Sequence, residues 1–347
     1  MTMQTLNTGK RRLGFPAQSS IAQPIILRHL PWHLPRHLPL PRLFLLWKRI
    51  VAGLCIAMAG YSTANAGPAD FSKPQTVKIQ GYNGHAMEPF ISRDGSLLFF
   101  NNRNQSTDQT DIYLAKRVTD LQFIFVGPLQ GANSQALDGV PSMDRQGNFY
   151  FVSTRQYNKT ANTLWQGQLR PPGRIINLKP LAGNVSRNKA LSLNIDAEVS
   201  ADGKSLYFTQ NLWDRSVGGI KTSNILLARK NRSGRFFRAV NAKALFKNIN
   251  SNLLEFAPAI TTDELTLYFT RVNKKSLQKG LENGFGLYVA TRPNRKSAFG
   301  KPKRIKAAKG YVEGATVIGN GCAIYFHKRV KNTFKIQYAR KLDCRRK

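Results

Sequence analysis

The sequence predicts an all-β protein, a five-bladed β-propeller that is closed by an N-terminal strand added to the last blade. Three observations predict this fold. A sixteen-residue unit recurs five times, equivalent turn positions lie 52 to 61 residues apart, and no stretch shows a sustained helical period. Units of this length, each with paired strands around a tight turn, are typical of propeller blades. The copies begin at Glu88, Val140, Asp196, Ala257 and Gly314.

Each copy contains two predicted strands around a tight turn. A short apolar strand comes first, and a pair such as Asp94-Gly95 or Asn320-Gly321 follows it. Gly and Asn tolerate positive φ and Asp hydrogen-bonds its own turn backbone, so these pairs favour hairpins. The fourth copy has Asp263-Glu264 instead and needs another turn type. The second strand is apolar on both faces, which indicates that neighbouring blades cover it.

The strands outside the repeated hairpin predict how the ring closes. A third strand follows every copy, and a weaker fourth strand, such as 236–240, follows the first four copies. The last copy lacks a fourth strand, while the segment 76–79 has no other predicted partner. Docking this segment on the last blade would close the ring and remove two free sheet edges.

The first 66 residues predict export rather than fold. Residues 1–41 contain a His-Leu-Pro repeat, and we expect a disordered leader or a segment upstream of the true translation start. Residues 42–66 combine basic residues, an apolar run at 50–60 and a small-residue cleavage motif before Gly67, which is typical of a signal peptide. An uncleaved anchor is the alternative, although the run is short for a bilayer span. Residues 67–347 then form one periplasmic or secreted propeller domain.

The cysteines fit an exported chain. Removal of the leader removes Cys55 and leaves Cys322 and Cys344. An even number of cysteines in an exported protein suggests a disulfide. The two residues flank the predicted last hairpin evenly, around the polar turn 331–333, so their sulfurs are expected to face each other across paired strands. Two free buried thiols are the alternative.

The charge favours anionic partners. The formal charge is +35; the first 66 residues hold eight basic residues and no acid, which leaves +27 for the propeller. The partners expected are an envelope polysaccharide, phospholipid headgroups or, through charge only, nucleic acid. The alternative is an ordinary charged exterior, and no nucleic-acid-binding motif accompanies the charge. The basic residues expected on the rim and outer wall include Arg229, Arg235, Arg292, Arg295 and Lys303.

Two sets of polar residues are predicted on one face, at the entries of the inner strands and at the exits of the second strands. The entry set consists of Glu88, Asp138, Asp196, Glu255 and Glu313. The exit set consists of Arg103, Arg155, Asn211, Arg271 and Arg329. A ligand site at the channel mouth, including a glycosidase carboxylate pair, is one interpretation. Acid–Arg pairs that tie each blade to its neighbour are the other, and recurrence favours them because a catalytic residue is normally needed once.

Histidines offer a weak candidate for a metal site. The chain after the leader has two, His85 near the first copy and His327 in the last copy, which are neighbours in a closed ring. With Glu88 and Glu313 they could bind a metal, but metal ligands usually come in a fuller set, so ordinary surface histidines are favoured.

The blade consensus resembles the WD40-like repeat of the TolB-type propeller family. The matches are Glu88-Pro89 with Ser92-x-Asp94-Gly95, the equivalent Ser200-x-Asp202-Gly203, and the Leu-Tyr-Phe strands at 206–208 and 267–269. The resemblance implies a propeller that binds envelope proteins, or the propeller domain of a peptidase or sugar-degrading enzyme. The chain departs from TolB in having no extra N-terminal domain and five repeats rather than six.

From these features we expect an exported, non-catalytic scaffold that binds a protein or an anionic polymer. The exit loops 101–110, 211–222 and 271–284, with the polar residues of the exit set, are the predicted contact surface. The alternative is a carbohydrate-active enzyme, a glycosidase or lyase. Its candidate carboxylates are Glu88, Glu255, Asp196 and Glu313. No reaction motif is present, and we expect no cofactor.

Overall fold

The computed structural model describes residues 71–103, 109–189, 191–214, 219–278 and 284–344. Contacts divide the chain into two units, Met1–Ser62 and Thr63–Lys347, and all described residues belong to the second unit. The predictions on the leader, the signal peptide and Cys55 therefore lie outside the described residues.

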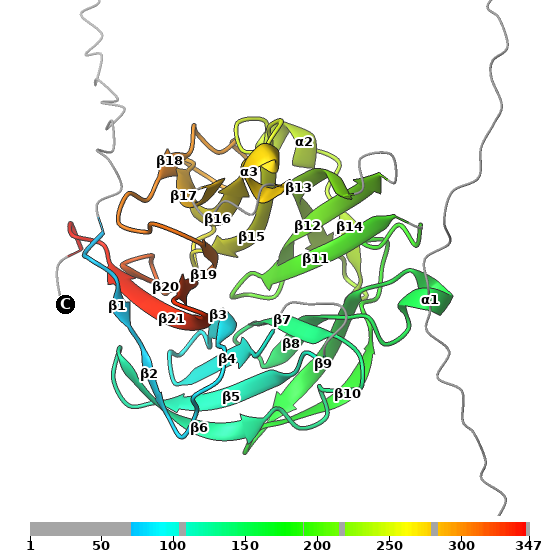
Figure 1. The fold of residues 1–347 in the computed structure, drawn as a ribbon. Helices are drawn as coiled ribbons and strands as arrows, with labels where there is room; N and C mark the ends of the chain where they lie inside the picture. Colours follow the sequence, from blue (N-terminus) through cyan, green and yellow to red (C-terminus); the bar gives the residue numbers. More distant parts are fainter. Residues whose placement is uncertain (1–70, 104–108, 190, 215–218, 279–283, 345–347) are drawn as a thin grey trace, which may run out of the picture. The chain divides into compact units, whose positions relative to one another are not determined.

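Five antiparallel blades surround a common axis, with the first strand of each blade innermost (Figure 1). Blade 1 contains β3 (Met87–Ile91), β4 (Leu97–Asn101), β5 (Ile112–Arg117) and β6 (Gln122–Pro128). Blade 2 contains β7 (Asp138–Met143), β8 (Asn148–Ser153), β9 (Leu164–Arg170) and β10 (Arg174–Pro180). Blade 3 contains β11 (Ser192–Val199), β12 (Ser205–Asp214), β13 (Gly219–Lys230) and β14 (Phe236–Arg238). Blade 4 contains β15 (Leu254–Ile260), β16 (Thr266–Val272), β17 (Phe285–Thr291) and β18 (Lys303–Arg304). Blade 5 contains β19 (Val312–Ile318), β20 (Ala323–Val330), β21 (Thr333–Arg340) and β1 (Gln75–Thr76). The predicted five-bladed propeller is confirmed.

The ring closes through the segment that the sequence left without a partner. β1 pairs antiparallel with β21, which places Thr76 opposite Gln337 in the last blade. The chain then continues into β2 (Lys78–Gln80), which pairs parallel with β6 at the outer edge of blade 1. The predicted closure is therefore confirmed, with the addition that one segment is hydrogen-bonded to both the last blade and the first.

Helix is minor among the described residues. The three helices, α1 (Tyr157–Thr160), α2 (Ala242–Leu245) and α3 (Lys274–Gln278), have four or five residues each. None of the helices in the described part of the chain is long and apolar enough to cross a membrane.

The second strands supply the packing between blades, as their two-sided apolar pattern predicts. Phe99 in β4 meets Phe149 in β8 with ring centroids 5.2 Å apart, and both rings are fully buried. Tyr207 in β12 joins a core cluster with Leu267 and Phe269 of the next blade. Burial of each such side chain contributes about 1.5–3 kcal/mol to folding, so the blade interfaces hold the ring together.

The hairpin turns use side chains as well as glycine. The Ser92 hydroxyl donates to Asp94 Oδ1 at 2.5 Å, and the Ser200 hydroxyl donates to Asp202 Oδ1 at 2.6 Å. In the fourth copy Glu264 takes the glycine position with φ 61°. Its carboxylate accepts the Tyr207 hydroxyl at 2.7 Å. This bond helps to hold a conformation that glycine would adopt without strain.

The basic rim is smaller than predicted. Arg292 is buried, with its guanidinium 3.9 Å from the Glu264 carboxylate, and Arg229 and Arg295 approach the same carboxylate at 3.6 and 3.2 Å. These arginines surround the Glu264 carboxylate, and the buried Arg292 in particular offers no surface charge.

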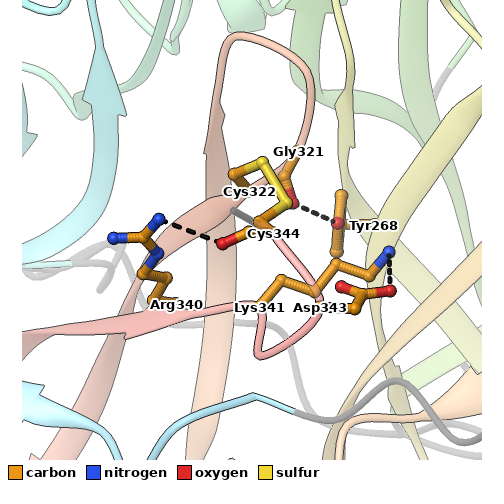
Figure 2. The surroundings of a disulfide bond; sticks show 7 residues. All are labelled: Tyr268, Gly321, Cys322, Arg340, Lys341, Asp343 and Cys344. Carbon is orange, nitrogen blue, oxygen red and sulfur yellow. Dashed lines mark hydrogen bonds and ion pairs between the residues drawn. A yellow bond between two sulfur atoms is a disulfide. The ribbon is translucent and has the colours of Figure 1, made fainter. Parts of the chain in front are cut away.

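The predicted disulfide is present. Cys322 lies just before β20 and Cys344 just after β21, with their Cα atoms 5.5 Å apart (Figure 2). The Tyr268 hydroxyl of blade 4 donates to Gly321 O beside the disulfide at 3.1 Å. The disulfide thus links the C-terminal tail to the start of β20 and lies beside blade 4.

Candidate active site at the propeller axis

The inner strands share a bulge that faces the axis. In every blade the register of the inner strand shifts by one residue, and the bulged residue has positive φ. A bulge re-aims the side chain at that point and costs backbone strain in any residue other than glycine. The bulged residues are Glu88, Val140, Asp196, Ala257 and Gly314. All five line one cavity at the axis, and only the bulges of blades 1 and 3 carry acids.

The second strands hold the bulged backbone in place. Val140 N donates to Asn101 Oδ1 at 3.1 Å, and Gly314 N donates to Thr270 Oγ1 at 3.2 Å. Glu88 N donates to His327 Nδ1 at 3.1 Å. The three acceptors occupy the same position of the repeat, in the preceding blade of the ring. The buried His327 is therefore a member of a repeated hydrogen-bonding ring, and blade 5 alone places an imidazole there.

His327 also joins a cluster of acids. Its Nε2 lies 3.1 Å from Glu313 Oε1, and ligand-capable atoms of Glu88, Glu313 and His327 all lie within 4.8 Å of one another. Complete burial lowers the pKa of His327, while the charge of Glu88 opposes this shift. Since Nδ1 accepts from Glu88 N, a neutral ring donates its Nε2–H to Glu313. The three side chains could bind a divalent cation, which would replace the contact between Nε2 and Glu313.

Asp196, which lines the same cavity as Glu88, has a perturbed titration. Burial raises the pKa of its carboxyl to about 6, and the charge of Glu313 adds to the shift. The Ala257 N–H, which donates to Asp196 Oδ2 at 3.0 Å, acts in the opposite direction. A carboxyl group with this pKa exchanges protons near neutral pH, as a general acid or base must.

Glu198, which sequence reasoning missed, lines the same cavity. Its Oε1 accepts from Arg93 Nη2 at 2.9 Å, and its Oε2 accepts from the Ser142 hydroxyl at 2.8 Å. The signal was available: Glu198 is an acid at a repeat position where the other copies carry Phe, Ser, Ala or Thr. Its charge is neutralised by Arg93, so it supports the cavity as part of an ion pair. The cavity has a volume of about 30 Å³, which is enough space to hold a water molecule.

Three acids of the entry set do not line this cavity: Glu313, which contacts His327, and Asp138 and Glu255, which lie in buried ion pairs with arginines. Arg155 Nη2 lies 2.6 Å from Asp138 Oδ1, and Arg271 Nε lies 2.8 Å from Glu255 Oε1. Both carboxylates are completely buried. Each pair lies within one blade, where we expected pairs between neighbouring blades. Glu255 therefore stands apart from the other carboxylates proposed for an enzyme.

The residues predicted to bind a partner are divided by the structure. Arg103 and Arg329 are exposed, while Asn211 is buried. Arg155 and Arg271 are mostly enclosed as partners of buried acids. The three exit loops lie partly outside the described residues.

The two histidines have separate roles. His85 Nδ1 accepts from Phe334 N at 3.2 Å, and its ring packs on Phe334. It is not among the residues of the Glu88–Glu313–His327 cluster. The metal site predicted from both histidines is therefore corrected. Of the two histidines, only His327 lies in the cluster with Glu88 and Glu313.

No protein-family model and no curated protein matches the chain. Among solved structures, the chain is similar to a candidate glycoside hydrolase from Bacteroides ovatus, with 9% identity, a TM-score of 0.50 and coverage of 82% of this chain and 97% of that one. The catalytic domain of the Coprinopsis cinerea GH62 α-L-arabinofuranosidase has 10% identity, a TM-score of 0.49 and coverage of 80% and 96%. TolB from Acinetobacter baumannii has 15% identity, a TM-score of 0.40 and coverage of 73% and 54%.

These comparisons support the propeller and correct the expected function. The likeness at such identities is one of fold. The prediction of a non-catalytic envelope scaffold is contradicted by the Bacteroides ovatus structure, a candidate glycoside hydrolase, and the carbohydrate-active alternative is taken up below.

Proposed function

We propose that this protein is a glycoside-cleaving enzyme whose active site lies at the mouth of the axial cavity. The observation that carries the proposal is the convergence of Glu88 and Asp196, from equivalent bulges of blades 1 and 3, on one cavity. Glycoside hydrolysis uses two carboxyl groups, one protonated and one ionised, whose environments separate their pKa values. The assignment of the similar Bacteroides ovatus propeller to the glycoside hydrolases supports the same reaction class.

In this proposal Asp196 is the general acid. Its raised pKa keeps a proton on the carboxyl group near pH 6, and it donates that proton to the oxygen of the leaving sugar. Glu88 is the general base that activates water for attack on the opposite side of the sugar ring. The small cavity favours this role, since its volume suits a water molecule, while the sugar binds outside it at the mouth.

Glu313 and His327 are positioning residues in this scheme. The imidazole accepts from the Glu88 backbone and so fixes the bulge that aims the Glu88 side chain. The Glu313 charge raises the pKa of Asp196 and so keeps it protonated at higher pH. Loss of the Glu313 charge is therefore expected to move the acidic group in a pH–rate profile to lower pH.

Hydrolysis of a panel of 4-nitrophenyl glycosides, together with reducing-sugar release from plant and bacterial polysaccharides, tests the proposal. Asp196→Asn and Glu88→Gln are each expected to lower kcat by about 10²–10⁴-fold, the usual contribution of a general acid or base. Asp202→Asn, a turn acid away from the cavity, is the matched control and should keep full activity. Hydrolysis of none of these substrates, or unchanged activity in Asp196→Asn, would contradict the proposal.

Two further expectations from the sequence enter here as proposals. Export by cleavage before Gly67 is supported by the disulfide, since such bonds persist in oxidising compartments. The N-terminal sequence of the secreted protein tests it. Membership of the repeats in the TolB-type family is supported by the Ser-x-Asp turns of blades 1 and 3.

A further inference from the structure

Blades 2 and 4 build the same arginine site. In each, the guanidinium pairs with the acid two residues before the bulge, Asp138 or Glu255. It also donates to a loop carbonyl six residues before that acid, Ala132 O in blade 2 and Ile249 O in blade 4, the latter at 2.7 Å. The site therefore combines one buried cation, one buried carboxylate and one carbonyl.

Blade 3 keeps this site but replaces its carboxylate with an amide. The residue two positions before the Asp196 bulge is Asn194, whose Oδ1 accepts from Arg238 Nη2 at 3.0 Å. Arg238 also donates to the loop carbonyl of Val185 from Nε at 2.9 Å and from Nη2 at 2.6 Å. Its Nη1 donates to Gln210 Oε1 at 2.8 Å. All four bonds go to neutral acceptors, so no acid among the described residues balances this guanidinium.

The local environment makes an unbalanced cation costly. Burial lowers the pKa of Arg238 to about 10, and the charge of Arg187 adds to the shift. A charge removed from water needs a partner of opposite charge or a full set of hydrogen bonds. Arg238 Nη1 carries two hydrogens but donates to one acceptor among the described residues, Gln210 Oε1. In the same part of the chain, Asn194 Nδ2 and the Thr222 hydroxyl are buried without a hydrogen-bond partner. The site is thus short of negative charge and of acceptors.

A cavity opens onto this site. It has a volume of about 290 Å³, at the lower end of the range for small-ligand sites. Arg187, Arg238, Gln210 and Asn224 supply its polar wall, and Leu212 and Leu226 belong to its apolar wall. None of the residues that line it is acidic.

We propose that this blade 3 cavity binds the carboxylate of an acidic sugar, a uronic acid residue. The carboxylate would accept from Arg187 and from the remaining Nη1–H of Arg238, which supplies the negative charge that blades 2 and 4 provide from within the chain. The leucines suit the apolar face of a sugar ring, and Gln210 and Asn224 suit its hydroxyls. The proposal does not depend on catalysis at the axis.

Binding of small ligands to the purified protein tests this site. Sodium galacturonate and sodium glucuronate are titrated beside galactose, acetate and inorganic phosphate, by calorimetry and by the thermal unfolding midpoint at low ionic strength. The uronates are expected to bind and to raise Tm, acetate to bind at least tenfold more weakly, and galactose not to raise Tm. Uronate binding no tighter than that of galactose, or preferential binding of phosphate, would overturn the assignment.

Asn194→Asp sharpens the test, because it restores the acid that blades 2 and 4 contain. The new carboxylate would pair with Arg238 and repel the ligand, so this variant should unfold at a higher Tm and bind uronate at least tenfold more weakly. Asn231→Asp adds the same charge to an exposed turn of blade 3 and should bind as the unmodified protein does. Arg187→Gln changes an exposed side chain and should also weaken uronate binding, by at least threefold. Unchanged uronate affinity in both Asn194→Asp and Arg187→Gln would overturn the proposal.

Discussion

The acids of blades 2 and 4 and those of blades 1 and 3 lie near the same face of the propeller, but their surroundings are opposite. Asp138 and Glu255 are held by an arginine, and each also accepts a serine hydroxyl and a serine N–H, from Ser134 and Ser251 respectively. Glu88 and Asp196 line a cavity at the axis. The position of Asp138 and Glu255 lies two residues before the position of Glu88 and Asp196 in the repeat, and the bulge at the second position turns its side chain to the axis.

This difference teaches that a repeated acid can serve the fold in one blade and chemistry in another. A carboxylate that is paired and fully hydrogen-bonded stabilises the native state as an anion. A buried carboxyl group whose pKa is raised, as at Asp196, lowers the stability of the native state when it is ionised. The two groups should therefore respond to neutralisation with opposite signs.

The largest expected effect on stability comes from neutralising a paired acid. Glu255→Gln leaves Arg271 buried without a counter-charge, and Asp138→Asn does the same to Arg155. Removal of one partner of a buried ion pair costs about 3–5 kcal/mol, so both variants should lose stability on this scale in urea unfolding. A loss under about 1 kcal/mol would show that these pairs do not hold their blades and would weaken the comparison.

The next effect has the opposite sign. The folded pKa of Asp196, about 6, lies above its usual value of 3.8, so the folded state binds a proton more tightly than the unfolded state. This group therefore costs stability above pH 6, by about 2–3 kcal/mol, and the cost disappears as the pH falls through 6 toward 4. Asp196→Asn should be more stable than the unmodified protein at pH 8 by about this amount and equal to it near pH 4.

The smallest effect is a shift in titration. The Glu313 charge is one of the causes that raise the pKa of Asp196, and burial is the larger cause. Glu313→Gln should therefore lower the pKa of Asp196 without returning it to 3.8. A carboxyl carbon titration by NMR measures this shift directly. An unchanged pKa of Asp196 in this variant would show that the Glu313 charge does not act on Asp196.

The repeats made much of the fold predictable. The five hairpins, the closing segment and the Cys322–Cys344 disulfide follow from spacing and from the missing last strand. The sequence does not predict which acids are paired with arginine and which line the cavity. That depends on where each acid lies relative to a bulge, and the residues of an apolar strand do not indicate where it bulges. Glu198 was missed because it interrupts the repeat, and Arg238 because it comes from the outer strand, 44 positions after Asn194.

The most direct test of this account is the free energy of unfolding of Asp196→Asn and Glu255→Gln, measured in urea at pH 8 beside the unmodified protein. The account predicts that Asp196→Asn gains stability and Glu255→Gln loses it. Loss of stability in both variants would contradict the distinction between axial and structural acids, and with it the proposed active site.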